Sequence, residues 1–298
     1  MIERARIAFF TAATSVVAAS ACLVSIDDGK VGGESTGGDA APTDGARVDG
    51  GATDGGNTSG DGSGRCATGM LAVPDETTRL FCMDKTEVTV GQYAAFINDA
   101  GSPEVLRLPL ECKWKGSLTF VPDNWNPSGD KTLPVTGVDW CDAWAFCTSA
   151  GKRLCRAIGG GAVEFTEGYA DASASEWMHA CSHAGAHDYP YPGAYDPTAC
   201  VGVDYVPKPT APLPVAQAAR CTGGYAGLVD MSGNVSEWED SCSTAHLALC
   251  DAGGPECDFC HNRGGGVFSN VFEMKCKSGD NGPRRLRLDD LGFRCCAD

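Results

Sequence analysis

Alternating apolar and polar residues indicate short strands and then a helix at the start of the region that follows Cys66. Three runs have the β-rich composition and the alternation that are typical of strands. They are Met70–Val73, Leu80–Met83 and Glu87–Val90. Overlapping the third run, Val88–Ala100 predicts a helix that places Tyr93, Phe96 and Ile97 on one face.

A second helical pattern covers Cys141–Ala150, where Trp144, Ala145 and Thr148 are spaced for one face. Gly151 is expected to end this helix, because glycine readily adopts the left-handed conformation that closes many helices. Much of the remaining chain is rich in Gly and Pro, which predicts long loops.

The segment Met1–Ala21 has the pattern of an export signal. Two arginines precede an apolar run from Ile7 to Ala19, which is shorter than the roughly 20 residues that cross a bilayer. The small residues before Cys22 resemble a bacterial lipoprotein box, in which the cysteine is lipidated after cleavage. We therefore expect an exported protein held on a membrane, at its periplasmic or cell-surface face. Ordinary secretion, with Cys22 first in the mature chain, is the alternative.

Residues 22–65 predict a flexible tether. Gly, Asp, Thr, Ser and Ala dominate this segment, so it cannot bury enough apolar surface to offset the entropy of ordering. Its acidic residues contribute to the formal net charge of -16. This acidity argues against nucleic acid as a partner. The rest of the chain, residues 66–298, has the length of one domain.

Seventeen cysteines on an exported chain indicate a disulfide framework, and sixteen remain if Cys22 carries a lipid. Four of them, Cys242, Cys250, Cys257 and Cys260, could instead form a zinc site, and the last two could form a redox pair. An oxidising compartment favours disulfides. Proximity along the chain suggests the pairs Cys66–Cys82, Cys112–Cys141, Cys200–Cys221, Cys242–Cys260, Cys250–Cys257 and Cys155–Cys296.

Three histidines recur at intervals of four residues, His179, His183 and His187. On one helix they would share a face and could bind a metal. Gly185 and the run Tyr189-Pro-Tyr-Pro192 indicate that the helix has ended by then. Ordinary surface or loop histidines are therefore the favoured interpretation.

Three blocks near the C-terminus resemble the formylglycine-generating enzyme (sulfatase-modifying factor) family. They are Gly227-Leu-Val-Asp-Met-Ser-Gly-Asn-Val-Ser-Glu-Trp238, Arg263-Gly-Gly-Gly266 and Leu291-Gly-Phe-Arg-Cys295. Upstream segments that begin at Phe81 and at Pro134 extend the resemblance to roughly residues 66–298. It implies a disulfide-rich α+β fold, related to C-type lectins, with little regular secondary structure. Asp84 and Glu87 lie in the opening block and are expected to be structural polar groups.

The resemblance also implies one more helix and two disulfides. The family motif Gly-Lys-Arg-Leu is present at Gly151–Leu154, but an insertion delays the pair Glu176-Trp177, which sets the next helix at about Ser173–Cys181. Two family disulfides correspond to Cys147–Cys295 and Cys181–Cys276.

Family members bind calcium at residues that match Asp230, Gly233, Val235 and Glu237. The side chains of Asp230 and Glu237 and the carbonyls of Gly233 and Val235 would supply the hard oxygens that calcium prefers. Asp230 stands where the family usually has asparagine. A turn whose carboxylates cap main-chain N–H groups is the alternative.

The oxidase centre of the family is not matched. Its two copper-binding cysteines should fall near Ser269 or Asn270 and between Val271 and Met274, and none of these residues is cysteine. Copper(I) prefers soft thiolates, so copper is not expected. Gly266 and Ser236 also replace the serine and the tryptophan that are usual in the family.

We therefore predict no catalytic residue and a domain whose oxidase activity has been lost. The function implied is binding of an extended peptide, an exported protein or a glycan. The alternative is an active sulfatase-modifying oxidase that converts a substrate cysteine to formylglycine, or performs a related oxidation.

Overall fold

The computed structural model describes residues 65–75, 80–99, 108–115, 120–243 and 254–298, all within one compact unit, Gly55–Asp298. The expected export signal, Cys22 and nearly all of the expected tether lie outside the described residues. No helix in the described part of the chain is long and apolar enough to cross a membrane.

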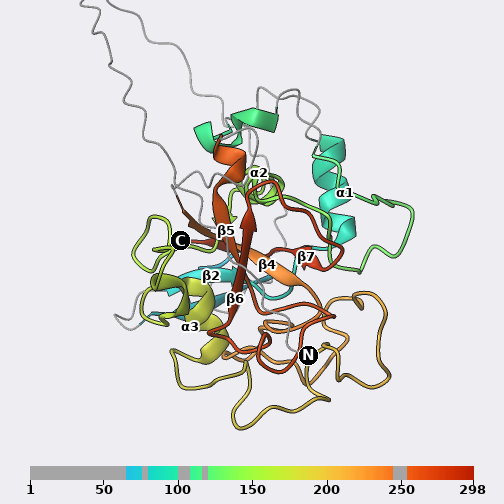
Figure 1. Ribbon diagram of the computed structural model, residues 1–298, viewed down its shortest axis with the longest axis vertical. Coiled ribbons are helices and arrows are strands. Elements are labelled where there is room, and N and C mark those ends of the chain that lie inside the picture. The colour runs from blue at the N-terminus through green and yellow to red at the C-terminus, as the bar shows by residue number, and fades with distance from the viewer. Residues whose placement is uncertain (1–64, 76–79, 100–107, 116–119, 244–253) are drawn as a thin grey trace, which may run out of the picture. The chain divides into compact units, whose positions relative to one another are not determined.

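Two four-stranded sheets form the middle of the described domain (Figure 1). The first has the order β1-β2-β8-β3, and all of its neighbouring strands are antiparallel. Its strands are β1 (Met70–Pro74), β2 (Leu80–Asp84), β3 (Arg153–Leu154) and β8 (Cys295–Ala297). The C-terminal strand therefore lies between the N-terminal hairpin and the middle of the chain.

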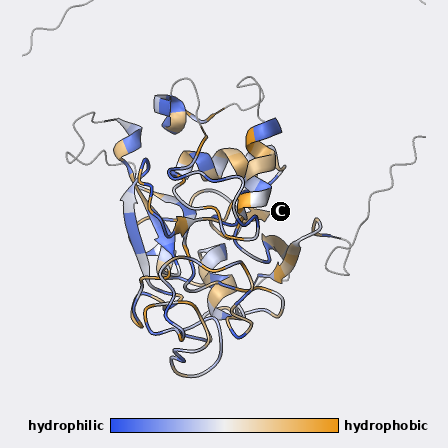
Figure 2. Cartoon of the chain, turned by 90° about the vertical axis from the view of Figure 1, so that its right-hand side faces the viewer, coloured by the Kyte–Doolittle hydropathy of each residue, from blue (hydrophilic) through white to orange (hydrophobic). Residues whose placement is uncertain are grey.

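The second sheet has the order β6-β5-β4-β7. Its strands are β4 (Ser236–Cys242), β5 (Phe259–Arg263), β6 (Gly279–Pro283) and β7 (Leu291–Gly292). Glu237 lies opposite Arg263 on one side and opposite Gly292 on the other. The three sequence blocks thus meet around one carboxylate. β6 carries only Gly, Asp, Asn and Pro. Figure 2 shows hydrophilic strands, coloured blue to white, as well as hydrophobic segments in orange.

Three α-helices lie at the ends of the domain, with α1 (Val90–Asp99) and α2 (Trp140–Ser149) towards one end and α3 (Glu176–Ser182) towards the other (Figure 1). Three short 3-10 helices accompany them at Leu110–Lys115, Gly168–Ala170 and Pro255–Cys257. The predicted helices are confirmed with shifted starts. Caps explain two of these starts, because Asp139 and Asp142 form a capping box before α2 and Ser175 caps α3.

The strand predicted at Glu87–Val90 is wrong. The Thr89 main-chain N–H donates to Gln92 Oε1 at 2.8 Å, and the Gln92 N–H donates to Thr89 Oγ1 at 3.2 Å. This reciprocal capping starts α1 at Val90. In place of the predicted strand, this segment forms a single isolated β-bridge, between Thr89 and Pro134.

The largest buried cluster is aromatic and joins the first two helices to the C-terminal segment. Tyr93 stacks on Phe146 with ring centroids 5.6 Å apart, and Phe146 packs edge-on against Phe293 at 5.4 Å. Such pairs add about 0.5–1.5 kcal/mol each beyond their buried area. The segment after β7 is therefore held against both helices.

Seven disulfides connect described cysteines, and they match the pairings expected from the sequence. Both pairs implied by the family, Cys147–Cys295 and Cys181–Cys276, are present. Cys257 is also disulfide-bonded, while Cys250, its expected partner, lies outside the described residues. Because Cys242 is bonded to Cys260, these two cysteines do not offer thiolates to zinc.

Candidate functional site

A pocket of about 780 Å³ lies beside β4, β5 and β6, at the position where the family blocks converge. Ser236 of β4, Asn262 of β5 and Asp280 of β6 contribute to its lining. The loop that follows Arg263 forms another wall through Gly265, Ser269, Phe272 and Glu273. The sequence-based search for the two cysteines pointed to this same loop.

Ser269, Asn270 and Met274, which lie where the two cysteines were expected, carry no thiol and do not converge. Ser269 lines the pocket, and its Oγ accepts from the Gly266 N–H at 3.1 Å. The Asn270 side chain accepts from the Phe272 N–H at 2.9 Å, which closes a local turn. Met274 is buried with Val201 and Val267 in a separate apolar cluster. The one sulfur of the loop therefore packs in the core.

Gly266 and Asp290 form a complementary pair in the pocket wall. A Cβ added to Gly266 would lie only 2.5 Å from Asp290 Oδ2, so glycine leaves the room that this carboxylate occupies. Burial raises the pKa of Asp290. A side chain at Gly266 would displace an acid that faces the ligand space.

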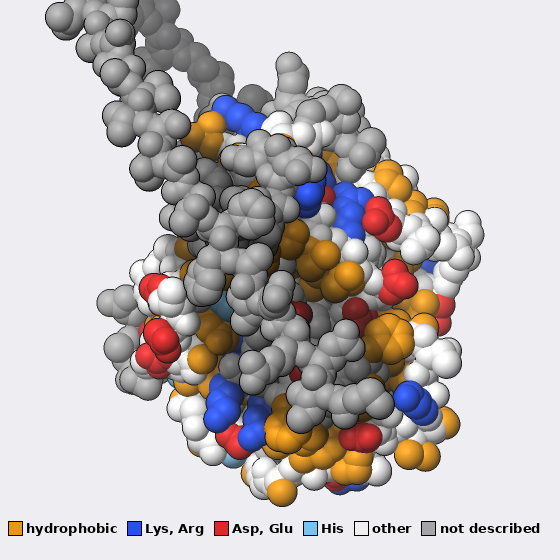
Figure 3. Space-filling view, in the orientation of Figure 1, with side chains coloured by type: hydrophobic (Ala, Val, Ile, Leu, Met, Phe, Trp, Pro, Cys, Tyr) orange, Lys and Arg blue, Asp and Glu red, His pale blue; other side chains and the backbone are white. Residues whose placement is uncertain are grey.

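The pocket combines exposed apolar side chains with an excess of acids. Phe272 and Leu288 line it and are 72% and 44% exposed. Glu273, Asp280 and Asp290 also line it, against a single lysine, Lys277. Apolar and acidic side chains lie close together on the face drawn in Figure 3. Such a surface favours a ligand that carries both apolar and cationic groups.

The expected calcium ligands do not line this pocket, and the side chains of Asp230 and Glu237 are buried. The Asp230 Oδ2 accepts from the Ala216 N–H at 2.5 Å. Arg294 donates to both Glu237 oxygens, with its Nε 2.7 Å from Oε2, and Trp177 Nε1 donates to Oε2 at 2.8 Å. Gly233 and Asp230 have left-handed φ values of 73° and 55°, which bend the loop tightly.

Glu87 completes a cluster of three buried acids around Arg294. Its Oε1 accepts from the Asn234 amide at 3.0 Å, while its buried Oε2 has no hydrogen-bond partner. Burial, followed by the nearby Asp230, raises the pKa of Glu87 well above its usual value. Burial also raises the pKa of Asp230 to about 6.

One buried arginine cannot neutralise three ionised carboxylates. The three acids are nevertheless not among the described groups of three ligands whose ligand atoms lie within 4.8 Å of one another. Glu87 Oε2 offers an open oxygen, whereas both oxygens of Glu237 are engaged. The sequence identified Asp230 and Glu237 but treated Glu87 as a turn residue. The position of Glu87 in the family block Asp84-Lys-Thr-Glu87 was the sequence signal that could have assigned Glu87 to this acid cluster.

The histidines do not share one helical face. α3 ends at Ser182, and His183 follows it in the left-handed conformation with φ 53°. His179 Nε2 lies 2.9 Å from the Tyr225 hydroxyl, while His183 Nδ1 lies 2.6 Å from the Gly224 carbonyl oxygen. Within the described ranges, the one group of three potential metal ligands is Cys155, Glu176 and Cys296. Cys155 is bonded to Cys296, so this group has no free thiolate to offer a metal.

The chain is similar to a known protein family and to characterised proteins. Residues 40–298 match the sulfatase-modifying factor enzyme 1-like domain. The formylglycine-generating enzyme of Mus musculus is 26% identical over 267 residues, which cover 73% of this chain and 66% of that protein. The chain thus spans just under two thirds of the length of this curated relative.

Two solved structures are similar to this chain over about three quarters of its length. The crystal structure of CarF is 25% identical with a TM-score of 0.48, and covers 73% of this chain and 86% of that one. The structure of PvdO from Pseudomonas aeruginosa is 16% identical with a TM-score of 0.48, covering 77% and 91% of the two chains.

Proposed function

From the premise that the chain belongs to the sulfatase-modifying factor enzyme 1-like family, we propose that it binds an extended peptide without oxidising it. The binding site is the pocket beside β4, β5 and β6. Its combination of an apolar rim and excess acids is the observation that carries this proposal. A peptide offers such a pocket both an apolar side chain and a basic side chain.

The state of the cysteines supports the absence of oxidase chemistry in this proposal. Each cysteine that the structure describes is in a disulfide, whereas copper(I) binding requires thiolates. Met274 packs in the core and is 1% exposed. The pocket therefore has no sulfur with which to hold copper beside a substrate thiol.

A peptide containing Cys-x-Pro-x-Arg tests binding and chemistry in one experiment. Calorimetry of the full chain should detect binding, and Phe272→Ala and Asp290→Asn should each weaken it by about tenfold or more. Leu110→Ala is the control, because Leu110 is an exposed apolar residue that does not line this pocket. Absence of binding, or equal loss in the control, would contradict the proposal.

The same peptide incubated with copper(I) and oxygen should keep an unchanged mass. Conversion of its cysteine to formylglycine would restore the alternative of an active oxidase. Binding of a defined glycan that competes with the peptide would instead assign the pocket to a sugar.

Calcium at the buried acid cluster and a lipid on Cys22 are further parts of this proposal. The unpaired Glu87 Oε2 and the excess of buried carboxylates over arginine support a cation at the cluster. The small residues before Cys22 support a membrane anchor. Cys22→Ser should release the full chain from the membrane fraction. A wild-type chain that is already soluble would refute the anchor.

A further inference from the structure

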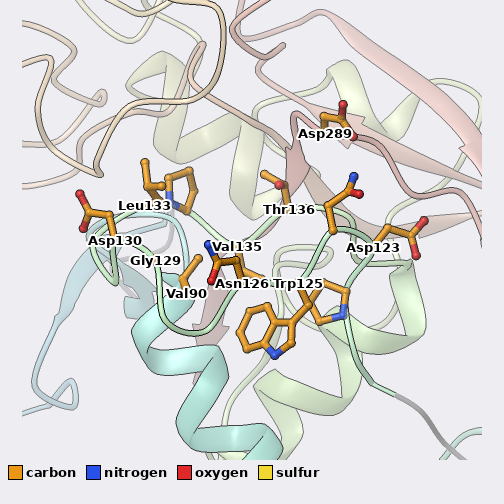
Figure 4. A pocket seen from close by; sticks show the side chains of 13 residues that line it. Val90, Asp123, Trp125, Asn126, Gly129, Asp130, Leu133, Val135, Thr136 and Asp289 are labelled. Carbon is orange, nitrogen blue, oxygen red and sulfur yellow. The ribbon is translucent and has the colours of Figure 1, made fainter.

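A second pocket, of about 400 Å³, lies in front of the loop that precedes α2 (Figure 4). Its volume is within the range of small-molecule sites. Eleven residues between 122 and 136, together with Val90 and Asp289, form its lining. No residue of this pocket lines the pocket assigned to the peptide, although Asp289 is the neighbour of both Leu288 and Asp290. The loop 288–290 therefore has one pocket on each side.

Trp125 supplies a fixed aromatic surface in this second pocket. Its ring packs edge-on against the buried Tyr93, with centroids 5.9 Å apart, and it remains only partly buried. One portion of the indole is thus held by the aromatic core while another borders the cavity. Because the ring is already fixed by packing, it loses little conformational entropy when a ligand binds.

The loop that carries Trp125 is anchored on both sides. The Asp123 N–H donates to the Gly137 carbonyl at 2.9 Å, and Arg287 Nη1 lies 3.0 Å from Asp123 Oδ1. Gly137 has φ 69°, and a Cβ there would lie 2.7 Å from the Asp123 carbonyl oxygen. On the far side, Asp130 accepts from the Thr132 N–H at 2.9 Å. The shape of the pocket is therefore set by the fold.

Polar side chains without partners line the same pocket as the indole. Within the described part of the chain, Asn124, Asn126 and Asp289 make no side-chain hydrogen bond or ion pair. Figure 4 shows the Asn126 amide beside the Trp125 ring, with Asp123 and Asp289 on one side and Asp130 on the other. Amides both donate and accept, and a carboxylate accepts.

We infer that this pocket binds a neutral sugar, as one unit of a glycan. A sugar ring presents a face of C–H groups that can stack on an indole, and its hydroxyls match unpaired amides and a carboxylate. Arg287 pairs with Asp123 but also with Asp139 and Asp142. Asp130 and Asp289 add further negative charge, so the pocket is acidic. This charge disfavours phosphorylated and carboxylated ligands.

Calorimetric titration of the full chain with four neutral trisaccharides tests the inference. The probes are cellotriose, maltotriose, mannotriose and triacetylchitotriose, with trigalacturonic acid and trilysine as charged comparisons. At least one neutral probe should bind with a Kd at or below about 1 mM, and Trp125→Ala should weaken it by about tenfold or more. Trp125→Phe should retain part of the affinity.

Two surface variants keep the test valid if Trp125→Ala fails to fold. Asn126→Ala and Asp289→Asn alter side chains without structural partners, and each should weaken sugar binding by several fold. Phe272→Ala is the matched control, since it removes an exposed aromatic residue from the other pocket. The inference is overturned if no neutral probe binds, if trilysine binds in their place, or if Phe272→Ala gives the same loss. Peptide binding can fail while sugar binding persists, so the two proposals are separable.

Discussion

Residues 266–275 and residues 230–237 lie against each other but differ in the groups they hold. The Val267 N–H donates to the Asn234 carbonyl at 2.9 Å, and Ser232 Oγ donates to the Met274 carbonyl at 2.7 Å. The first segment carries serine, asparagine and methionine where reactive cysteines were expected. The second keeps two buried carboxylates, and one of them, Glu237, pairs with Arg294 from outside the segment.

This difference follows from what each set of residues does for folding. A reactive side chain at a pocket wall serves catalysis rather than folding. Its replacement by serine therefore leaves the hydrogen bonds of the surrounding backbone intact. Removing one partner of a buried ion pair lowers the free energy of unfolding by several kcal/mol. Both members of such a pair therefore tend to be kept or replaced together. Four predictions test this contrast, from the largest expected effect to the smallest.

Arg294→Met should cause the largest loss of stability. It would leave Glu237 without its bidentate partner and remove the one arginine among three buried acids. We expect the free energy of unfolding to fall by about 3–5 kcal/mol, seen as a large drop in Tm by calorimetry. Arg220→Met is the control, because its exposed pair with Asp196 is screened by solvent and should contribute little to stability. Similar losses in both variants would refute the contrast.

Asp230 should make stability depend on pH. Its pKa is raised from 3.8 to about 6, so the folded state binds a proton more tightly than the unfolded state does. Its contribution to stability is therefore greatest at low pH and is lost as the pH rises from about 4 to about 6, by about 3 kcal/mol. Asp230→Asn should remove this component in calcium-free urea unfolding. If the pH dependence of the unfolding free energy is the same in the variant as in the wild type, Asp230 does not make this contribution.

Calcium should stabilise the domain most at pH values above 6, where Asp230 is ionised. A ligand present at a hundredfold excess over its Kd adds about 2.7 kcal/mol. Chelation should therefore lower Tm at pH 7.5 and have little effect at pH 5. Glu87→Gln should reduce the response by removing the open oxygen. Equal Tm values with calcium and with chelator at both pH values would exclude the site.

Ser269→Ala should have the smallest effect. Ser269 lines the pocket, and its hydroxyl accepts one hydrogen bond from the Gly266 N–H. We expect a change of at most about 1 kcal/mol in unfolding free energy and little change in peptide affinity. Met274→Ala offers the contrast within the same loop, since burial of Met274 predicts a loss of about 2–5 kcal/mol.

The sequence predicted those elements in which local signals agree with the final packing. Tyr93 and Phe96 have helical spacing and become buried in α1. β4 and β5 were not predicted, because buried Glu237, Glu239, His261 and Arg263 interrupt any apolar alternation. These polar residues are buried because they meet partners from other segments, and one strand cannot reveal them.

The candidate site was only partly predictable for the same reason. The sequence blocks identified the loop 266–275 and the acids Asp230 and Glu237. Tyr169, Lys277 and Asp290 enter the pocket from separate segments and belong to no short pattern that points to a ligand. Glu87 joins the acid cluster from the other end of the chain, through a hydrogen bond to Asn234.

The adjacent residues Cys295 and Cys296 have a topological consequence. One is bonded to Cys147 in the aromatic core, and the other is bonded to Cys155 in a second buried cluster. Covalently, the chain between residues 147 and 295 is a closed ring. One proteolytic cut within it, even in the long surface loops, leaves both fragments attached. Such nicking would change the number of chain ends but would not divide the domain into separate molecules.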